Sequence, residues 1–393
     1  MSGCTSSATR RRSSLPDEAA SVFADHAAGA PLRPAVAAAM VAALNGGPPN
    51  PSGAHRAARS AAMVLDGARR RIADELGADA ADVVLTGGGT ESCALGLLGP
   101  RNPSAVCISA IEHVAVRRAA EVAAARRGVE LIVLPVDSQG RFDLEAALAL
   151  VPDGALVSVM AANNETGVIE PIAELSRALR ADRSILLHCD AVAAAPFASI
   201  AELWPDVDLL SIAGHKVGGP PGVGVLVASR DLDLEAIVPG GSQESGRRAG
   251  TQDVAGATGL AVALEEVARE RQLGQIAELA HRRDALARAL SSSPGVAITS
   301  DGADRLAGHL HLTLPGVRSE EVLVLLDRAG IAASAGAACA SGAPETSQVL
   351  LAMGMDERRA RSALRLTMGV STTSAAWDRL AEVVPEVLSS LAR

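Results

Sequence analysis

The stretch "DVVLTGGGTESCALGLLG", residues 82–99, decides the fold because it joins a buried strand to a helix through three glycines. A short apolar run precedes the glycines, and a segment of helical pattern follows them. Gly89 and Thr90 fall at the start of the helix, where free backbone N–H groups and the helix dipole favour a phosphate. A glycine turn is as often only a tight connection, so the stretch alone predicts a strand–turn–helix unit.

The same alternation of strand and helix continues up to residue 229. Apolar runs of strand length lie at residues 105–113, 130–137, 155–167, 184–192, 208–214 and 223–229. Helical segments such as "VAVRRAAEVAAARRG" (114–128) and "IAELSRALRA" (172–181) separate several of them. This order predicts an α/β fold with a mostly parallel sheet that is covered by helices on both faces.

The pattern changes after Gly256. One long helical stretch, residues 255–290, leads into an alternating strand, "GHLHLTLPG" (308–316), and then into a helix at 319–330. We therefore predict a disordered leader at 1–22, a large domain at 23–272 and a small α+β domain at 273–393. The Ser/Arg-rich leader has no apolar run, which excludes a secretory signal; organelle targeting is the alternative to disorder.

Composition excludes several classes of function. The chain of 393 residues is 48% hydrophobic and carries a net charge of −9, which is typical of a globular protein and argues against nucleic-acid binding. Aromatic residues make up only 1%, so platforms for base stacking are scarce. No apolar run reaches the ~18 residues that span a bilayer, and we expect a soluble, cytoplasmic protein. Five cysteines without a CxxC pair indicate neither a disulfide framework nor a metal site.

Lys216 is the only lysine among 36 basic residues. A guanidinium stays charged, whereas a lysine amine can lose its proton and form a Schiff base. A lysine that survived by chance on a loop is the plain alternative. Its surroundings, "LLSIAGHKVGGPPGVG" (209–224), place it directly after a predicted strand, where ligands bind in α/β sheets.

Other polar residues end neighbouring predicted strands. His113, Asn163, Asn164 and Asp190 each follow an apolar run, and each taken alone has an ordinary structural explanation as a cap or a turn residue. Together with Lys216 and the glycine turn they suit pyridoxal 5'-phosphate. This cofactor needs an amine for its aldehyde, a helix N-terminus for its phosphate and an aspartate for its ring nitrogen.

The sequence resembles the class V aminotransferase-like, fold-type I enzymes that use pyridoxal phosphate. Among these enzymes it is most similar to the cysteine desulfurases of iron–sulfur assembly. The resemblance runs from about residue 23 to residue 375. The motifs that carry it are "NPSGAH", "TGGGTES", "IEHVAV", "ANNETG", "HCDAV", "GHKVGGPPGVG", "GGSQESGRRAGT", "SAGAACASG" and "ALRLTMG". It implies a large domain with a mostly parallel seven-stranded sheet, a smaller α+β domain and a homodimer.

The resemblance also implies roles for single residues. Those expected to hold the cofactor are Lys216, Asp190, His113, Asn164, Thr90, Gly89, His215 and, from the neighbouring subunit, Thr251. Among them, Lys216 binds the aldehyde and moves the substrate's Cα proton, and His113 stacks on the ring. Arg365, helped by Asn50, is expected to bind the substrate carboxylate.

Cys339 is the expected sulfur acceptor. It lies in a loop of Ala, Gly and Ser without apolar periodicity, unlike Cys93, Cys107 and Cys189, which we interpret as small buried hydrophobic residues. The implied reaction converts L-cysteine to L-alanine and leaves a persulfide on Cys339 for transfer to an acceptor protein or a small-molecule pathway. Two alternatives remain: a related enzyme such as a C–S lyase, selenocysteine lyase or aminotransferase, and a non-catalytic scaffold for sulfur transfer.

The sequence departs from the family pattern at several positions. Ala193 stands where the family usually has a glutamine, and Ala213 where it has a serine; both would contact the cofactor. The segment "AAGA" (27–30) replaces an "AATT"-like sequence, and Pro221 replaces a second lysine. Since a lost hydrogen bond to a charged group costs about 1.5–3 kcal/mol, we expect the cofactor to be held less tightly than is usual for the family.

Overall fold

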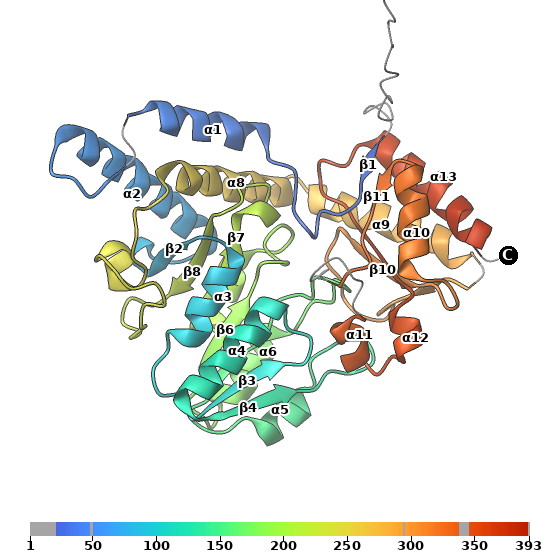
Figure 1. Ribbon diagram of the computed structural model, residues 1–393, viewed down its shortest axis with the longest axis horizontal. Coiled ribbons are helices and arrows are strands. Elements are labelled where there is room, and N and C mark those ends of the chain that lie inside the picture. Colours follow the sequence, from blue (N-terminus) through green and yellow to red (C-terminus); the bar gives the residue numbers. More distant parts are fainter. Residues whose placement is uncertain (1–20, 48–49, 294, 338–345, 392–393) are drawn as a thin grey trace, which may run out of the picture.

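The computed structural model describes residues 21–47, 50–293, 295–337 and 346–391. Residues 1–20 of the predicted leader and Cys339 lie outside these ranges. The chain forms two packed parts, with α1 to α8 and one large sheet on one side of Figure 1 and α9 to α13 with small sheets on the other.

The large sheet has seven strands in the order β2-β8-β7-β6-β5-β3-β4. The strands are β2 (Val83–Thr86), β3 (Ala105–Ser109), β4 (Glu130–Leu134), β5 (Leu156–Ser158), β6 (Leu186–Asp190), β7 (Leu209–Ala213) and β8 (Gly224–Ala228). From β7 to β4 every pair is parallel, whereas β8 is antiparallel to both of its neighbours. The predicted mostly parallel α/β fold is therefore confirmed.

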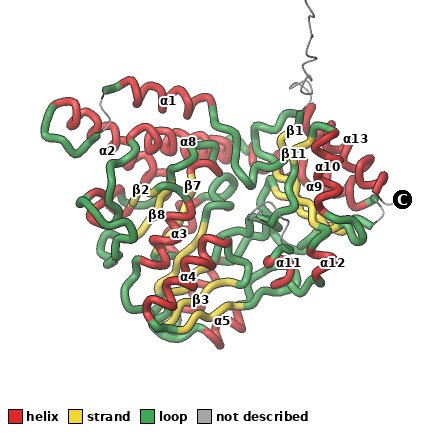
Figure 2. Tube along the Cα trace, viewed as in Figure 1, coloured by secondary structure: helices red, strands yellow, loops and turns green. Residues whose placement is uncertain are grey.

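Helices cover both faces of this sheet (Figures 1 and 2). On one face α3 (Gly89–Leu98) and α4 (Val114–Arg127) pack against side chains such as Val106 and Ile108. Cys107, between those two residues, points to the other face and its larger core. The helices on that face are α2 (Arg56–Leu76), α5 (Leu144–Leu150), α6 (Ile172–Arg180), α7 (Ile200–Leu203) and α8 (Val254–Gln272), with α1 (Pro34–Asn45) lying on α8.

The C-terminal part has its own core. An antiparallel sheet of order β12-β10-β9 (β9 Ala297–Ile298, β10 His309–Thr313, β12 Ala363–Thr367) packs against three helices, α9 (Gln275–Ser291), α10 (Ser319–Arg328) and α13 (Ser374–Leu391). The remaining helices are α11 (Gln348–Ala352) and α12 (Glu357–Ala360). The start of the described chain also belongs here, since β1 (Val22–Phe23) pairs with β11 (Ile331–Ala332).

The prediction of one long helix over residues 255–290 was wrong. The structure has two helices, α8 and α9, separated at Leu273 and Gly274. Gly274 has a φ of 71°, in the left-handed region that glycine tolerates best. The chain changes direction at this residue, so α8 ends before it and α9 begins after it. The predicted domain division after residue 272 coincides with the end of α8, and the division itself stays a prediction.

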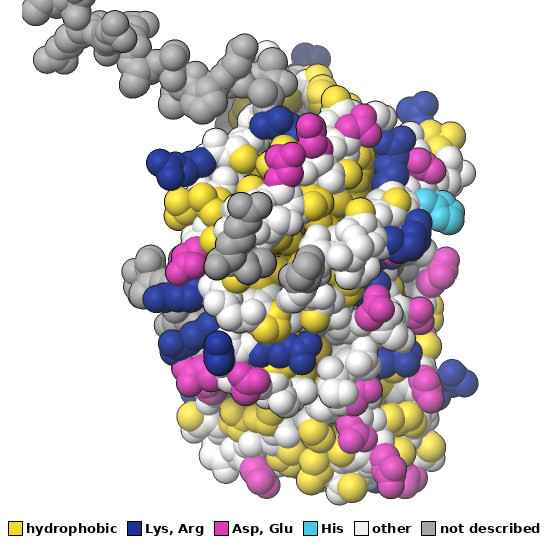
Figure 3. All heavy atoms as spheres, turned by 90° about the vertical axis from the view of Figure 1, so that its right-hand side faces the viewer, with side chains coloured by type: hydrophobic (Ala, Val, Ile, Leu, Met, Phe, Trp, Pro, Cys, Tyr) yellow, Lys and Arg dark blue, Asp and Glu magenta, His cyan; other side chains and the backbone are white. Residues whose placement is uncertain are grey.

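The surface is mixed in character. On the face formed by the C-terminal elements, charged side chains of both signs alternate with apolar ones (Figure 3). On α1 only Val36 is buried, although nearly all of its side chains are apolar.

None of the helices in the described ranges combines the length and apolar character that crossing a membrane requires.

Candidate active site

The parallel strands bring the predicted residues to one cavity of about 280 Å³ at the carboxyl edge of the sheet. The predicted cofactor residues that line it are Gly89, Thr90, His113, Asn164, Asp190, His215 and Lys216. Ala193 and Ala213, the two departures from the family pattern, line it as well. Residues that are up to 127 positions apart in sequence thus share one site because their strands are neighbours.

The glycine turn forms one wall of this cavity. Gly88 has a φ of 135° and precedes the first turn of α3, so the free N–H groups of that turn border the cavity. A Cβ atom on Gly89 would lie 3.0 Å from Val192 Cγ2 and 3.2 Å from Ala213 Cβ. A Cβ on Gly224, at the start of β8, would lie 2.6 Å from the carbonyl carbon of Gly88. Close packing therefore requires glycine here and leaves an open cradle for an anion.

Asp190 ends β6, is buried and lines the same cavity. Its Oδ1 accepts a hydrogen bond of 3.0 Å from the backbone N–H of Val192. Burial raises the pKa of Asp190, and the nearby His113 opposes this rise. A buried carboxylate of this kind is stabilised when a cation or an N–H⁺ group binds next to it.

His113 supplies a flat ring. It is the N-cap of α4, and its Nδ1 accepts a hydrogen bond of 3.2 Å from the N–H of Ala115. This bond assigns the proton of the neutral ring to Nε2. Burial lowers the pKa of His113, so its ring is uncharged at neutral pH and suited to stacking on an aromatic cofactor.

Lys216 follows β7 in a short turn, Gly214–Lys216. Its Nζ donates hydrogen bonds to the carbonyl oxygens of Ala27 and, at 3.1 Å, Ala28. Burial and the positive charge of Arg365 lower the pKa of Lys216 to about 8. Near neutral pH the fraction of unprotonated, nucleophilic amine is therefore larger than for an ordinary lysine.

Arg365 lies on β12, next to the site. Its Nη2 forms an ion pair of 2.7 Å with Asp25, and its Nη1 donates to the carbonyl oxygen of Asn164 at 2.9 Å. Its Nε is buried and has no hydrogen-bond partner among the described residues. The guanidinium is thus held in place by Asp25 and the carbonyl oxygen of Asn164. Sequence patterns did not indicate Asp25, because its contact with Arg365 arises only from tertiary packing.

Two predicted residues, Asn50 and Thr251, lie outside this cavity. Asn50 is exposed in the connection between α1 and α2, and its Oδ1 accepts a hydrogen bond from the N–H of Ser52. Thr251 is exposed and lines a small separate cavity of about 120 Å³ that includes Gly87. Cys339 lies outside the described residues. The roles of Asn50, Thr251 and Cys339 stay predictions.

The three cysteines that we interpret as small hydrophobic residues lie in the core. Cys93, Cys107 and Cys189 are buried free thiols, and burial raises the pKa of each of them. This confirms the interpretation of these three as small hydrophobic residues rather than nucleophiles.

A buried acid that no sequence pattern indicated, Glu112, lies near the site. Glu112 precedes His113, and its Oε1 accepts a hydrogen bond of 2.7 Å from the N–H of Met160. Burial and the nearby Asp190 raise the pKa of Glu112 well above its ordinary value. No pattern in "IEHVAV" indicates burial, so only the structure identifies this side chain.

These groups fit pyridoxal phosphate. Lys216 offers an amine to the aldehyde, the turn before α3 offers N–H groups to the phosphate, and Asp190 offers a carboxylate to the ring nitrogen. The ring of His113 can stack on the cofactor ring, and the side chain of Asn164 can donate to its phenolic oxygen. All of them line one cavity.

The pKa of Lys216 can be measured directly because the chain has no other lysine. In cofactor-free protein, the rate of acetylation of Lys216, followed by peptide mass spectrometry to separate it from the N-terminal amine, is expected to rise with a midpoint near pH 8. Removing the positive charge in Arg365→Gln raises this midpoint, whereas the exposed-site control Arg358→Gln leaves it unchanged. A midpoint near the ordinary value of 10.5 in the unmodified chain would contradict the buried position of the amine.

Comparison with known proteins places the chain in a family. The model of the family "Aminotransferase class-V" matches residues 22–380. An "IscS-like cysteine desulfurase" of Mycobacterium tuberculosis is 37% identical over 386 residues, which cover 94% of this chain and 97% of the relative. Among solved structures, a "NifS-like protein" is similar with a TM-score of 0.86 and 29% identity, covering 94% of this chain and all of that one. The structure titled "SspA in complex with cysteine" has a TM-score of 0.77 and 26% identity, covering 90% and 100%. The chain therefore belongs to the class-V aminotransferase family and, within it, to the cysteine desulfurases.

Proposed function

We propose that this enzyme removes sulfur from L-cysteine with pyridoxal phosphate and leaves it as a persulfide on Cys339. The observation that carries the proposal is the single lysine, half-buried and with a lowered pKa, in the cavity that Asp190, His113 and the glycine turn also line. The similarity to a structure described as a complex with cysteine supports the choice of substrate.

Bound pyridoxal phosphate supplies an electron sink that stabilises negative charge on the substrate's Cα. The turn at residues 87–90 and His215 would hold its phosphate, and Asp190 would keep its ring nitrogen protonated. Lys216 takes the Cα proton, for which an amine of pKa about 8 is well matched near neutral pH. Arg365 binds the carboxylate and orients the substrate toward Lys216.

Cys339 completes the proposed reaction as a thiolate. It attacks the substrate sulfur, so that an S–S bond forms while the Cβ–S bond breaks, and the electron pair of that bond goes to the carbon fragment. Protonation of this fragment yields L-alanine, and the sulfur remains on Cys339 as a persulfide. The balance is one L-cysteine and one enzyme thiol giving one L-alanine and one enzyme persulfide.

Replacing the proposed nucleophile separates this reaction from that of a C–S lyase. Cys339→Ala is expected to keep cofactor binding and spectral changes with L-cysteine, but to form no protein persulfide and almost no alanine. The matched control Cys107→Ala, in the core, keeps both products and is only destabilised. Alanine, pyruvate and persulfide are assayed in parallel. Unchanged turnover in Cys339→Ala with release of pyruvate would favour β-elimination and overturn the persulfide route.

The two alanines in the cofactor cavity predict weak cofactor retention. Ala193→Gln and Ala213→Ser each add a side chain that can donate a hydrogen bond within the cavity. We expect each change to slow the loss of cofactor during dialysis about threefold to tenfold, since a net hydrogen bond contributes about 1 kcal/mol. Ala181→Gln, at an exposed helix end, is the control and leaves the rate unchanged. Absorbance of the retained cofactor gives the rate, and no change in either cavity variant would show that other groups replace the missing contacts.

We also propose a homodimer that forms through α1 and α2. Val41 and Leu44 on α1 are 56% and 60% exposed, and Met63 on α2 is 68% exposed. Large apolar side chains exposed together are typical of an interaction surface. Thr251, exposed as well, is then available to a second subunit.

An acidic substitution in this surface tests the dimer. Leu44→Asp and Met63→Asp are expected to shift the protein to monomers in sedimentation-velocity experiments, because a charge would have to be buried at the interface. Val324→Asp is the matched control, at a position 57% exposed on α10 in the other part of the molecule. Dimers that persist in both variants would exclude this surface as the contact.

A further inference from the structure

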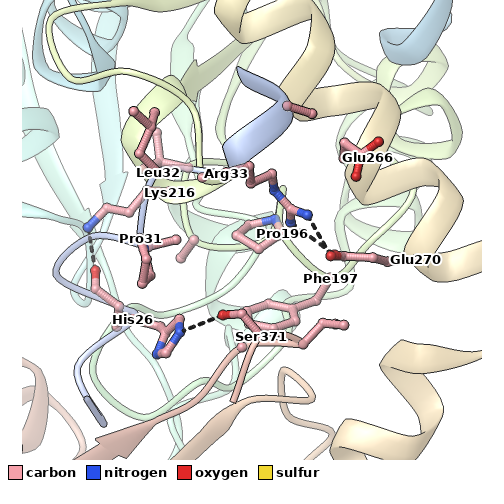
Figure 4. Close-up of a pocket in the computed structure, with 18 of the residues that line it drawn as sticks. His26, Pro31, Leu32, Arg33, Pro196, Phe197, Lys216, Glu266, Glu270 and Ser371 are labelled. Atoms are coloured by element: carbon pink, nitrogen blue, oxygen red, sulfur yellow. Dashed lines mark hydrogen bonds and ion pairs between the residues drawn. The ribbon is translucent and has the colours of Figure 1, made fainter. Parts of the chain in front are cut away.

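The carboxylate of Asp190 carries the proposed contact with the cofactor's ring nitrogen, so the groups that hold it matter for the reaction. The N–H of Val192 donates to its Oδ1 at 3.0 Å. The amine of Lys216 is engaged elsewhere. Lys216 also lines a second cavity of about 340 Å³, where its Nζ donates to the carbonyl oxygens of Ala27 and Ala28 (Figure 4). Further polar groups around Asp190 come from the sheet and from α3.

Three polar side chains form a buried row across β5, β6 and β7, here called the serine–histidine row. His188 is fully buried, with its Nδ1 2.8 Å from Ser158 Oγ and its Nε2 2.9 Å from Ser211 Oγ. The row lies on the face that α3 covers, since a Cβ on Gly96 of α3 would lie 2.7 Å from His188 Cδ2. Asp190 follows His188 by two positions on β6 and is paired with Ser211 of β7. The row therefore ends next to Asp190.

Cys93 on α3 joins this row to Asp190. The residue is 1% exposed and lies in the lining of the cofactor cavity, and its thiol hydrogen-bonds with both Ser211 and Asp190. Burial and the nearby Asp190 raise the pKa of Cys93 well above its ordinary value, so the thiol keeps its proton. Cys93 therefore packs like a hydrophobic residue and in addition offers its S–H to the carboxylate.

The direction of the hydrogen bonds follows from the charged end. An ionised carboxylate only accepts, so Cys93 donates to Asp190, and its sulfur accepts from the hydroxyl of Ser211. The oxygen of Ser211 then accepts from the Nε2–H of His188, whose ring is neutral because burial lowers its pKa to about 3. Nδ1 of that ring carries no proton and accepts from the hydroxyl of Ser158. All donors thus point toward the carboxylate, and aligned hydrogen bonds strengthen one another.

We propose that Cys93 is a positioning residue. Its thiol, aligned by the serine–histidine row, keeps the carboxylate of Asp190 ionised and in one orientation for the cofactor's ring nitrogen. Burial raises the pKa of Asp190, and the hydrogen bond from Cys93 is one of the contacts that oppose this rise. The inference rests on the proposed function, because Asp190 acts on the substrate only through the cofactor. The hydrogen bonds themselves do not need the cofactor.

The S–H stretching band of Cys93 tests the last hydrogen bond in cofactor-free protein. Subtracting the infrared spectrum of Cys93→Ala isolates this band, and subtracting that of Cys107→Ala gives a buried reference thiol on the other face of the sheet. We expect the Cys93 band at a lower frequency than the Cys107 band, because a carboxylate is a strong acceptor. In the Asp190→Asn background only the Cys93 band moves, to higher frequency. Coinciding bands, or a Cys93 band that Asp190→Asn does not move, would overturn the proposal.

The tautomer of His188 tests the direction of the row. Long-range ¹H–¹⁵N NMR spectra of cofactor-free protein, in which the His188 signals are identified by their loss in His188→Gln, are expected to show the proton on Nε2. A proton on Nδ1 would reverse the row and contradict donation toward Asp190.

Substitutions at Cys93 separate hydrogen bonding from packing. Cys93→Ala removes the donor and is expected to raise the dissociation constant of pyridoxal phosphate about fivefold to tenfold in absorbance titrations. Cys93→Ser keeps a donor and retains the original constant, as does the control Cys107→Ala. Equal weakening in Cys93→Ala and Cys93→Ser would leave Cys93 a packing role only and overturn the proposal. A shifted S–H band together with no alanine from L-cysteine would instead reject the proposed function and leave the hydrogen bonds standing.

Discussion

Four neighbouring strands, β3, β5, β6 and β7, run parallel, so their carboxyl ends reach the same edge of the sheet. Each strand has one chemically active side chain at or just beyond its end: His113, Asn164, Asp190 and Lys216, in this order. The antiparallel strand β8 closes the same edge, and its Gly224 packs against the glycine turn that precedes α3. A change in strand order would separate these groups, because no other feature of the chain brings them together.

The electrostatic balance around Lys216 depends on both parts of the molecule. Burial and Arg365 lower the pKa of the amine, whereas Asp25 and Asp190 oppose this effect. Asp25 belongs to the N-terminal segment that crosses to the C-terminal sheet, and it also forms the ion pair with Arg365. The carboxylate of Asp25 thus affects the pKa of the proposed base, Lys216, and also holds the proposed carboxylate-binding group, Arg365.

Lys216 also lies between two cavities of different character. On one side the glycine turn, Asp190 and His113 suit a charged cofactor. On the other side the walls are mostly apolar, and the basic side chain of Arg33 is paired with Glu270. Ala193 is part of both linings, so its small side chain enlarges both cavities.

Much of the fold follows from local patterns in the sequence. Apolar runs alternating with helical segments predict the mostly parallel sheet, since this order forces crossover connections. The glycine turn at 87–89 and the position of Lys216 after a strand are equally visible in the sequence. The break between α8 and α9 at Gly274 was missed, because an isolated glycine in a helical pattern does not by itself show a left-handed conformation.

Contacts between distant segments were decided only by the tertiary structure. The ion pair of Asp25 with Arg365 joins residues 340 positions apart. Glu112 is buried next to Met160 and Asp190, which are distant from it in the sequence. The alternation in "GHLHLTLPG" predicts a strand with two faces, yet packing of the two parts of the molecule buries both of them and leaves His309 without a partner in the described chain. The sequence by itself determined which residues are chemically able to act and on which elements they lie. Packing determined their burial and neighbours, and with them their pKa values, because these depend on groups that no local pattern specifies.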